Sequence, residues 1–146
     1  MELLPTPGST DDVRCYTDGA SRGNPGPAAG AFILVDREGK IIEERGWLIG
    51  TRTNNEAEYE ALIAGLEAAA GHGCRVLSVF SDSELVVRQM QGTYRVRSLR
   101  LLPYHTRARE ALARFTRVSF RSVPREDPLI QRADLLCNQV LDSLSR

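Results

Sequence analysis

The sequence predicts an α/β protein in which a mixed sheet is flanked by helices. Short apolar runs with strand character alternate with helical segments, and the elements follow the order β-β-β-α-β-α-α-β-α. The chain has 146 residues, 42% of them hydrophobic, which is enough to bury one ordinary core. We therefore expect a single domain over residues 13–146, preceded by a disordered tail over residues 1–12 that is rich in Pro and Gly.

The first half of the chain predicts three strands and a long helix. A strand over Val13–Asp18 precedes a loop rich in Gly and Pro. Strands over Ala29–Asp36 and Lys40–Ile49 form a hairpin around the turn at residues 37–40. From Asn55 to Gly71 the apolar residues follow the period of a helix, whose apolar face is formed by Tyr59, Leu62, Ile63, Leu66 and Ala70.

The second half predicts two further strands and three helices. Arg75–Ser81 is a strand, and Asp82–Gln91 is a short helix that Gly92 closes. A helix over Leu99–Phe115 is interrupted at Pro103, and a fifth strand covers Val118–Val123. The last helix, Gln131–Leu144, has an apolar face formed by Ala133, Leu136, Cys137, Val140, Leu141 and Leu144.

Composition excludes several classes of protein. The mean hydropathy is −0.28, and no apolar run approaches the roughly 18 residues of a membrane span. No secretory signal is visible at the amino terminus. The three cysteines, Cys15, Cys74 and Cys137, lack the spacing of a zinc site and are odd in number, so we expect buried, reduced thiols. These features predict a cytoplasmic protein that does not bind membranes, and we expect a monomer.

A net charge of zero conceals an uneven distribution of charge. Residues 88–125 carry ten arginines against one acid, Glu110, whereas residues 1–87 carry 14 acids and seven bases. Such an asymmetry indicates a polyanionic partner near the later segment. The alternative is a solvated helix face that happens to be rich in arginine, and charge alone does not decide between the two.

Four carboxylates lie at positions where neither a buried core nor a helix cap requires a carboxylate. Asp18 ends the first strand and Asp82 directly follows the fourth, at the edge where α/β sheets place ligands. Glu58 lies at the border of a buried helix face, and Asp134 lies beside the apolar face of the last helix. Taken singly, Asp18 could start a turn, Asp82 could cap a helix and Asp134 could interact favourably with the dipole of its helix.

Together, such carboxylates can converge on one point, where they repel each other unless a metal ion binds between them. Hard divalent ions prefer oxygen ligands, and Mg²⁺ is the best match. Two Mg²⁺ ions about 4 Å apart are a widespread device for in-line attack on a phosphodiester. The sequence therefore predicts phosphodiester chemistry at a magnesium site.

Four motifs together resemble type 1 ribonuclease H over about residues 13–144: YTDGASRGNPGP, TNNEAEYEAL, SDSELV and RADLLCN. The resemblance implies the ribonuclease H-like three-layer fold, a five-stranded mixed sheet with helices on both faces. It also implies an endoribonuclease that hydrolyses the RNA strand of RNA–DNA hybrids by a two-metal-ion mechanism and leaves 5′-phosphate and 3′-hydroxyl ends. The implied cofactor is Mg²⁺, with two ions per site when substrate is bound, and Mn²⁺ as an alternative.

The resemblance also implies roles for particular residues. Asp18 would bridge both ions, Asp134 would help to hold the ion that activates the attacking water, and Glu58 and Asp82 would hold the ion at the leaving 3′-oxygen. Substrate would be bound by Ser21, Arg22, Gly23, Asn24, Thr53, Asn54 and Asn55. In this set Asn24 and Thr53 would seat a DNA phosphate, and the others would face the DNA backbone or the wide minor groove, where 2′-hydroxyls are displayed.

The sequence departs from the family pattern in two places. Many relatives carry an auxiliary His in the loop before the last helix, where this chain reads VPREDPLIQ, and Arg125 or Glu126 is expected to substitute. No lysine-rich handle follows Tyr94, and the arginines of residues 88–125 are expected to replace part of it.

Two alternatives to a ribonuclease H enzyme remain. One is a catalytically silent hybrid- or RNA-binding module on the same fold. The other is a phosphate-binding α/β protein, disfavoured because the Gly-rich loop matches neither GxxxxGK[ST] nor GxGxxG.

Overall fold

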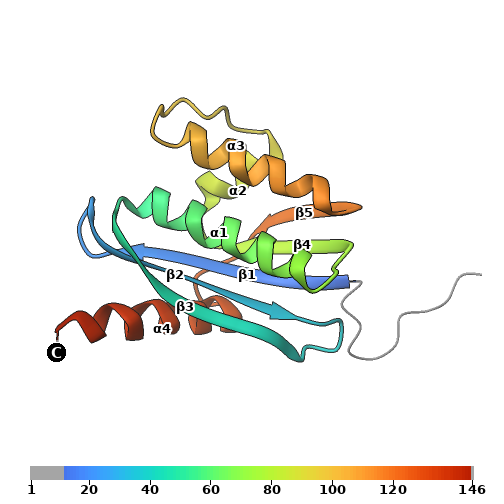
Figure 1. Cartoon of the computed structure of the whole chain (residues 1–146), viewed down its shortest axis with the longest axis horizontal. Helices are drawn as coiled ribbons and strands as arrows, with labels where there is room; N and C mark the ends of the chain where they lie inside the picture. Colours follow the sequence, from blue (N-terminus) through green and yellow to red (C-terminus); the bar gives the residue numbers. More distant parts are fainter. Residues whose placement is uncertain (1–11, 146) are drawn as a thin grey trace, which may run out of the picture.

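The computed structural model describes residues 12–145 as a three-layer α/β arrangement. A five-stranded sheet has the strand order β3-β2-β1-β4-β5. Helices α1, α2 and α3 cover one face of the sheet and α4 covers the other (Figure 1). The expected mixed sheet with helices on both faces is therefore confirmed.

The order of the strands explains why the sheet is mixed. β1 (Asp12–Ser21), β2 (Gly26–Val35) and β3 (Ile41–Arg52) pair antiparallel through short connections. β4 (Val76–Ser81) returns after a helix and pairs parallel to β1, and β5 (Arg117–Ser122) pairs parallel to β4. A helical crossover is the connection that a parallel pair needs. β1 is thus the central strand, with neighbours of opposite sense.

β1 continues beyond the predicted end at Asp18, and this prediction was wrong. Its antiparallel pairing with β2 runs on to Ser21 and Ala28, whereas its parallel pairing with β4 stops at Tyr16 and Phe80. Asp18 therefore lies on a strand that still has one neighbour but has lost the other. This opening beside β1 is the place where the site described below is built.

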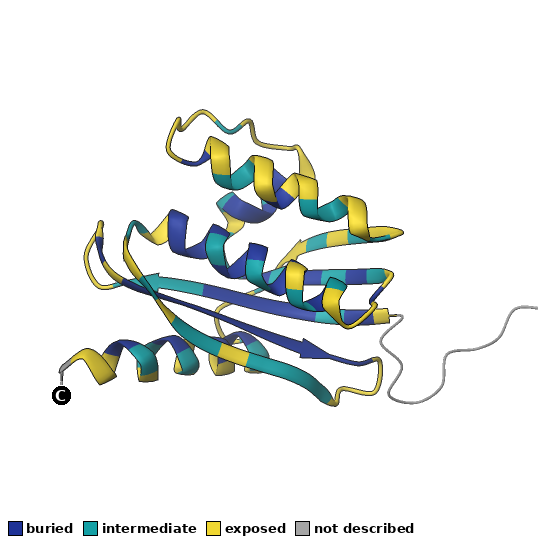
Figure 2. Cartoon of the chain, viewed as in Figure 1, coloured by how far each residue is buried: buried dark blue, intermediate teal, exposed yellow. Residues whose placement is uncertain are grey.

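Two apolar clusters lie on either side of the sheet. Figure 2 shows that β2 and much of β1, between these clusters, are buried. Side chains of β1 alternate between them, as expected for a strand: Val13 and Cys15 face α1, and Tyr16 faces α4. The three cysteines are free and buried, as predicted. Because β1 is buried on both faces, its one ionisable group at the open end, Asp18, is also drawn into the interior, at 6% exposure.

The first two helices begin at side-chain caps. α1 (Asn54–Gly71) begins at Thr53, which forms a capping box with Glu56. α2 (Glu84–Gln91) is capped by Ser83 and closed by Gly92 in the left-handed conformation. The alternative role of Asp82 as this cap is excluded, since the Ser83 hydroxyl accepts the Val86 N–H. Asp82 is left with its carboxylate available for another purpose.

The last two helices differ from expectation at their ends. α3 (Leu102–Ala111) begins at Leu102, and Pro103 lies in its first turn, where a missing N–H costs nothing, so Pro103 does not interrupt it. A 3₁₀ turn follows at Leu112–Arg114. α4 (Pro128–Asp142) begins three residues earlier than predicted, because Asp127 caps it and Pro128 suits its first position. After it, Leu144 is 53% exposed and does not belong to the apolar face.

The predicted tail, residues 1–12, lies outside the described residues except for Asp12, which is already part of β1. Between residues 12 and 145, no helix is long and apolar enough to cross a membrane.

Candidate active site

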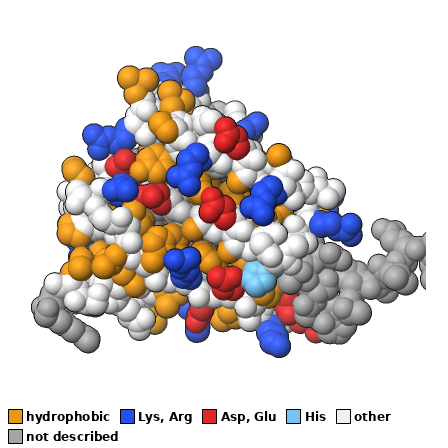
Figure 3. Space-filling model, in the orientation of Figure 1, with side chains coloured by type: hydrophobic (Ala, Val, Ile, Leu, Met, Phe, Trp, Pro, Cys, Tyr) orange, Lys and Arg blue, Asp and Glu red, His pale blue; other side chains and the backbone are white. Residues whose placement is uncertain are grey.

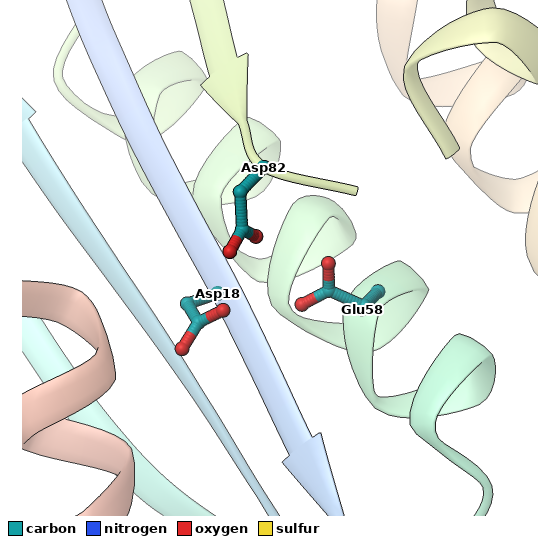
Figure 4. Close-up of side chains that lie close together, drawn as sticks. All are labelled: Asp18, Glu58 and Asp82. Carbon is teal, nitrogen blue, oxygen red and sulfur yellow. The ribbon is translucent and has the colours of Figure 1, made fainter. Parts of the chain in front are cut away.

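Three carboxylates from three different elements meet at the open end of β1 (Figure 4). Asp18 lies on β1, Glu58 on the second turn of α1, and Asp82 directly after β4. One oxygen of each side chain lies within 4.8 Å of the others. Residues 18, 58 and 82, which are far apart in sequence, therefore form one compact cluster.

The backbone holds this cluster together through an unusually close approach of α1 to β1. The Gly19 N–H donates a hydrogen bond to the Glu58 carboxylate. A Cβ atom on Gly19 would lie 2.3 Å from the Ala57 carbonyl carbon and 2.4 Å from the Glu58 nitrogen. Only glycine permits this contact. Gly19 thus determines how closely Glu58 approaches Asp18.

Gly19→Ala is accordingly expected to push α1 away from β1 and to lower the melting temperature, because overpacking a rigid backbone contact costs about 1–3 kcal/mol or more. It should also weaken divalent-metal binding, since Glu58 moves with α1. Gly71→Ala is the matched control, because a Cβ there meets no atom within 4 Å. Thermal melts and metal titrations of both variants make the check. A Gly19→Ala protein as stable as the control would contradict the close contact.

Burial and mutual repulsion disfavour the ionised forms of the three carboxyls. Burial, with the neighbouring charges of Asp82 and Asp134, raises the pKa of Asp18 to about 8. Burial and the Asp18 charge also raise the pKa of Glu58 well above its usual range, against the opposing hydrogen bond from Gly19. Burial raises the pKa of Asp82 too, although the Arg125 guanidinium opposes this. The cluster therefore needs a proton or a cation to offset its charge.

The donor set fits a divalent cation better than a proton. Asp18 Oδ2 is the buried side-chain oxygen that has no hydrogen-bond partner among the described residues, and buried polar atoms are normally paired. Its neighbours are further carboxylate oxygens, the ligands that hard divalent ions prefer. The cluster is thus a divalent-metal site by its chemistry.

Asp134 lies at the rim of the same site. An open pocket of about 460 Å³ is lined by all four predicted carboxylates together with Arg125 and the last residues of β1, Gly19, Ala20 and Ser21. Asp134 comes from the second turn of α4 and is exposed, so it is outside the compact cluster of three. The helix dipole has most of its effect in the first turn of a helix. Because α4 begins at Pro128, Asp134 lies beyond that turn. Its charge nevertheless acts on Asp18.

The Gly-rich loop is bound to the beginning of α1 by a pair of reciprocal hydrogen bonds. The Ser21 N–H donates to Asn54 Oδ1 at 2.9 Å, and the Asn54 N–H donates to Asn24 Oδ1 at 3.0 Å. Ser21, Asn54 and Asn55 line the carboxylate pocket. The structure therefore places these predicted substrate-binding residues next to the metal site, while Gly23 forms the bend of the loop at φ +121°.

A second pocket adjoins the first on the side of α2. It has a volume of about 470 Å³ and is lined by Asn24, Thr53 and Asn55 and by residues of the loop before α3, namely Arg95, Arg97, Ser98 and Arg100. The sequence indicated a basic segment but did not single out these three arginines. A signal was present, because arginines alternate with Tyr94 and Val96 over residues 94–97. Glu56 joins the two sides, since its carboxylate accepts the Thr53 N–H at 2.9 Å and lies 3.6 Å from Arg100 Nη1.

The remaining predicted residues lie in different places. Arg125 lines the carboxylate pocket with its Nε 3.8 Å from Asp82 Oδ2, and its side chain is 85% exposed. Glu126 is exposed and does not line that pocket. Arg22 lines neither pocket and is instead bound by α4, where its Nη2 lies 2.6 Å from Asp142 Oδ1. Of the two proposed substitutes for the auxiliary His, the structure brings only Arg125 to the site.

The mixed five-stranded sheet and the carboxylate cluster at the open end of its central strand β1 define a ribonuclease H-like protein with a divalent-metal site. Residues 16–140 match the family model described as reverse transcriptase-like. A crystal structure of RNase H1 from Halobacterium salinarum superposes with a TM-score of 0.86 at 47% identity, covering 90% of this chain and 98% of that one. LC11-RNase H1, solved in complex with an RNA/DNA hybrid, superposes with a TM-score of 0.86 at 37% identity, covering 92% and 99%.

The chain belongs to the type 1 ribonuclease H family. The curated ribonuclease HI of Halobacterium salinarum is 48% identical over 130 residues, which are 89% of this chain. This chain spans 64% of the length of that relative.

Proposed function

We propose that this protein is an endoribonuclease that hydrolyses the RNA strand of RNA–DNA hybrids and leaves 5′-phosphate and 3′-hydroxyl ends. The observation that carries the proposal is the convergence of Asp18, Glu58 and Asp82 beside the Ser21–Asn54 hydrogen bond. A silent binding module on this fold would have no need of buried, mutually repelling carboxylates. We also propose that residues 13–146 act as one catalytic domain in a cytoplasmic monomer.

Asp18, Glu58, Asp82 and Asp134 would together hold the two Mg²⁺ ions. When bound, such ions supply a nucleophile at neutral pH and stabilise the developing charge on the phosphodiester. The chain itself supplies the geometry: Gly19 holds Glu58 in place, and the end of β4 presents Asp82 to Asp18. Arg125 places a positive charge beside Asp82, where it can attract a scissile phosphate.

Recognition of RNA would fall to the polar groups beside the carboxylates. Ser21, Asn54 and Asn55 line the pocket on the side of α1, and amides can donate to and accept from a 2′-hydroxyl. An A-form helix displays these hydroxyls in a wide, shallow minor groove that a protein surface can reach. The hydrogen bonds between Ser21, Asn24 and Asn54 keep these groups in place before substrate binds.

The neighbouring pocket would bind the DNA strand through its phosphates. Among the described residues, Arg95 and Arg97 have no carboxylate partner, and they line the same pocket as Asn24 and Thr53. Figure 3 shows Lys and Arg side chains at the top of the molecule, over the loop that precedes α3. Arginines without a carboxylate partner are suited to phosphate contacts. These residues would thus serve in place of a lysine-rich handle.

The experiment that tests the proposal compares labelled RNA–DNA hybrid, double-stranded RNA and single-stranded RNA, each with Mg²⁺ and with EDTA. We expect cleavage of the hybrid in Mg²⁺ and none in EDTA, with 5′-phosphate ends on the products. Tight hybrid binding without cleavage in Mg²⁺ or Mn²⁺ would instead establish the silent module. Parallel reactions in Mn²⁺ determine which ion the site uses best.

Hybrid binding should also weaken steeply with salt. Each neutralised phosphate contributes about −0.7 to −0.9 to the slope of log affinity against log salt, as for single-stranded and B-form DNA. Replacing Arg95 and Arg97 together by Ala should reduce the slope by about two such increments, measured by fluorescence anisotropy in EDTA. The control pair is Arg114 and Arg117, next to the start of β5, at the far end of that strand from Arg125. An identical slope in both double variants would mean that Arg95 and Arg97 belong to a solvated surface and do not contact phosphates.

A further inference from the structure

Asp134 is bound by a neighbouring side chain that the sequence did not single out. Asn138, one turn further along α4, donates from Nδ2 to Asp134 Oδ2 at 3.2 Å. The other three carboxylates are placed by buried elements, whereas Asp134 is exposed and has rotamers available in solvent. A hydrogen bond from the same helix face is therefore a means by which α4 restricts the direction of this carboxylate.

The oxygen of the same amide faces a residue of the Gly-rich loop. Arg22 Nη2 donates to Asn138 Oδ1 at 3.3 Å and, one turn further on, to Asp142 Oδ1 at 2.6 Å. Asp134, Asn138 and Asp142 are spaced by four residues and so lie along one face of α4. Figure 1 shows the loop after β1 and the carboxyl-terminal end of α4 at the same end of the molecule.

The chemistry of the two neighbours determines which way the amide points. A guanidinium has only donors and an ionised carboxylate only acceptors, so the Asn138 oxygen must face Arg22 and its NH₂ group must face Asp134. The reversed amide would lose both hydrogen bonds. Asp142 anchors Arg22 through an ion pair, and Arg22 thereby holds Asn138 in the orientation that binds Asp134.

We propose that Asn138 is a positioning residue for Asp134 and that Arg22, through Asn138, links the substrate-binding loop to the metal site. The inference rests on the proposed function for its meaning in catalysis, but the link itself is a property of the protein without substrate. Side chains that orient metal ligands commonly affect metal affinity or activity by about 10–100-fold.

The test uses Asn138→Leu, Arg22→Leu and the double variant, with Gln139→Leu as the control on an exposed neighbouring position of α4. Mn²⁺ is titrated into each protein without nucleic acid, and free Mn²⁺ is counted by electron paramagnetic resonance. We expect Asn138→Leu to weaken binding about tenfold. Arg22→Leu should weaken it in the same direction, and the double variant should be no weaker than Asn138→Leu, because both act through one amide.

The sign of the Arg22→Leu effect is the sharpest part of this test. If Arg22 acted only through its charge, removing a cation near the site would tighten Mn²⁺ binding. If it acts through Asn138, its removal loosens binding. Tighter or unchanged Mn²⁺ binding in Arg22→Leu, or unchanged binding in Asn138→Leu, would overturn the inference. All variants should melt within a few degrees of the wild type, because Arg22 and Gln139 are exposed and Asn138 is only half-buried.

Hybrid cleavage supplies an independent readout. Asn138→Leu should lower kcat and raise the Mn²⁺ concentration needed for half-maximal rate, with KM for the hybrid little changed, and added Mn²⁺ should restore much of the rate. Arg22→Leu should in addition raise KM if the loop contacts substrate. Failure of the wild type to cleave hybrid would contradict the proposed function alone, whereas an unaltered Mn²⁺ affinity in the variants would contradict the link alone.

Discussion

Asp18→Asn and Asp82→Asn are each expected to abolish hybrid cleavage while leaving the fold intact. The amide has nearly the shape of the carboxylate but not its charge, so the metal is held weakly or in the wrong place. Bound metal contributes several kcal/mol of transition-state stabilisation, and each 1.4 kcal/mol is about tenfold in rate. We therefore expect losses of about a thousandfold or more in kcat, measured in Mg²⁺ on a labelled hybrid.

The control for this experiment is Glu67→Gln. Glu67 is an exposed carboxylate on the same helix as Glu58 but lies away from the cluster, with its Oε1 3.8 Å from Arg107 Nη2. It should keep full activity. Circular dichroism of all three variants checks that the fold is unchanged. Full activity in Asp18→Asn or Asp82→Asn would show that the carboxylate pocket is not the catalytic site.

The second large effect concerns stability without metal. The pKa of Asp18 is about 8 in the folded protein, against an ordinary value of 3.8. Between these values the folded state binds more protons than the unfolded state, so the free energy of unfolding falls as pH rises. We expect the melting temperature of the wild type in EDTA to decline as pH is raised from about 5 to about 8. The contribution of this group is largest below its unfolded pKa and is lost above its folded pKa.

Divalent metal should reverse this decline, because it binds the ionised cluster of the folded state. Binding to the native state alone stabilises by about 2.7 kcal/mol at a ligand concentration of a hundred times Kd. The largest increase in melting temperature from Mg²⁺ is therefore expected near pH 8, with a smaller one near pH 5, where protons already offset the repulsion. The measurement is a set of thermal melts in EDTA or millimolar Mg²⁺ across this range.

Asp18→Asn separates repulsion from structural support. It removes one buried charge, so its melting temperature in EDTA at pH 8 should equal or exceed that of the wild type, with a flatter pH dependence and a smaller response to Mg²⁺. A variant that is clearly less stable in EDTA and has an unchanged Mg²⁺ response would mean that Asp18 supports the local fold and does not bind metal.

Local pattern was sufficient to identify the order of the elements and the carboxylates at their ends. The period of the apolar residues reflects a helical or extended backbone, and their positions within that period show which face is buried. A window of about ten residues contains both. For the same reason Glu58 could be recognised at the border of a buried helix face. The grouping of residues 18, 58, 82 and 134 also followed from their positions at strand ends and on helices, whereas the resemblance to the family added their individual roles. The structure places all four around one pocket.

The limits of the elements were less predictable, because they depend on neighbours far along the chain. β1 extends to Ser21 since β2 still pairs with it there, and no property of residues 19–21 alone requires this. Pro103 lies in the first turn of α3, where the sequence pattern indicated an interruption, because the helix begins at Leu102 and not at Leu99. Helix and strand ends are decided by such tertiary partners more than by propensity.

By itself, the sequence determined the α/β class, the helical or extended state of each segment and the residue types at the metal site, all of which follow from local periodicity and side-chain chemistry. Only the tertiary structure decided how these residues meet. It brought α1 against Gly19, ended the pairing of β4 beside Asp18, and drew Arg22 to Asn138 and away from the pockets that were expected to include it. These contacts join residues up to 120 positions apart, as between Arg22 and Asp142, so no local pattern could predict them.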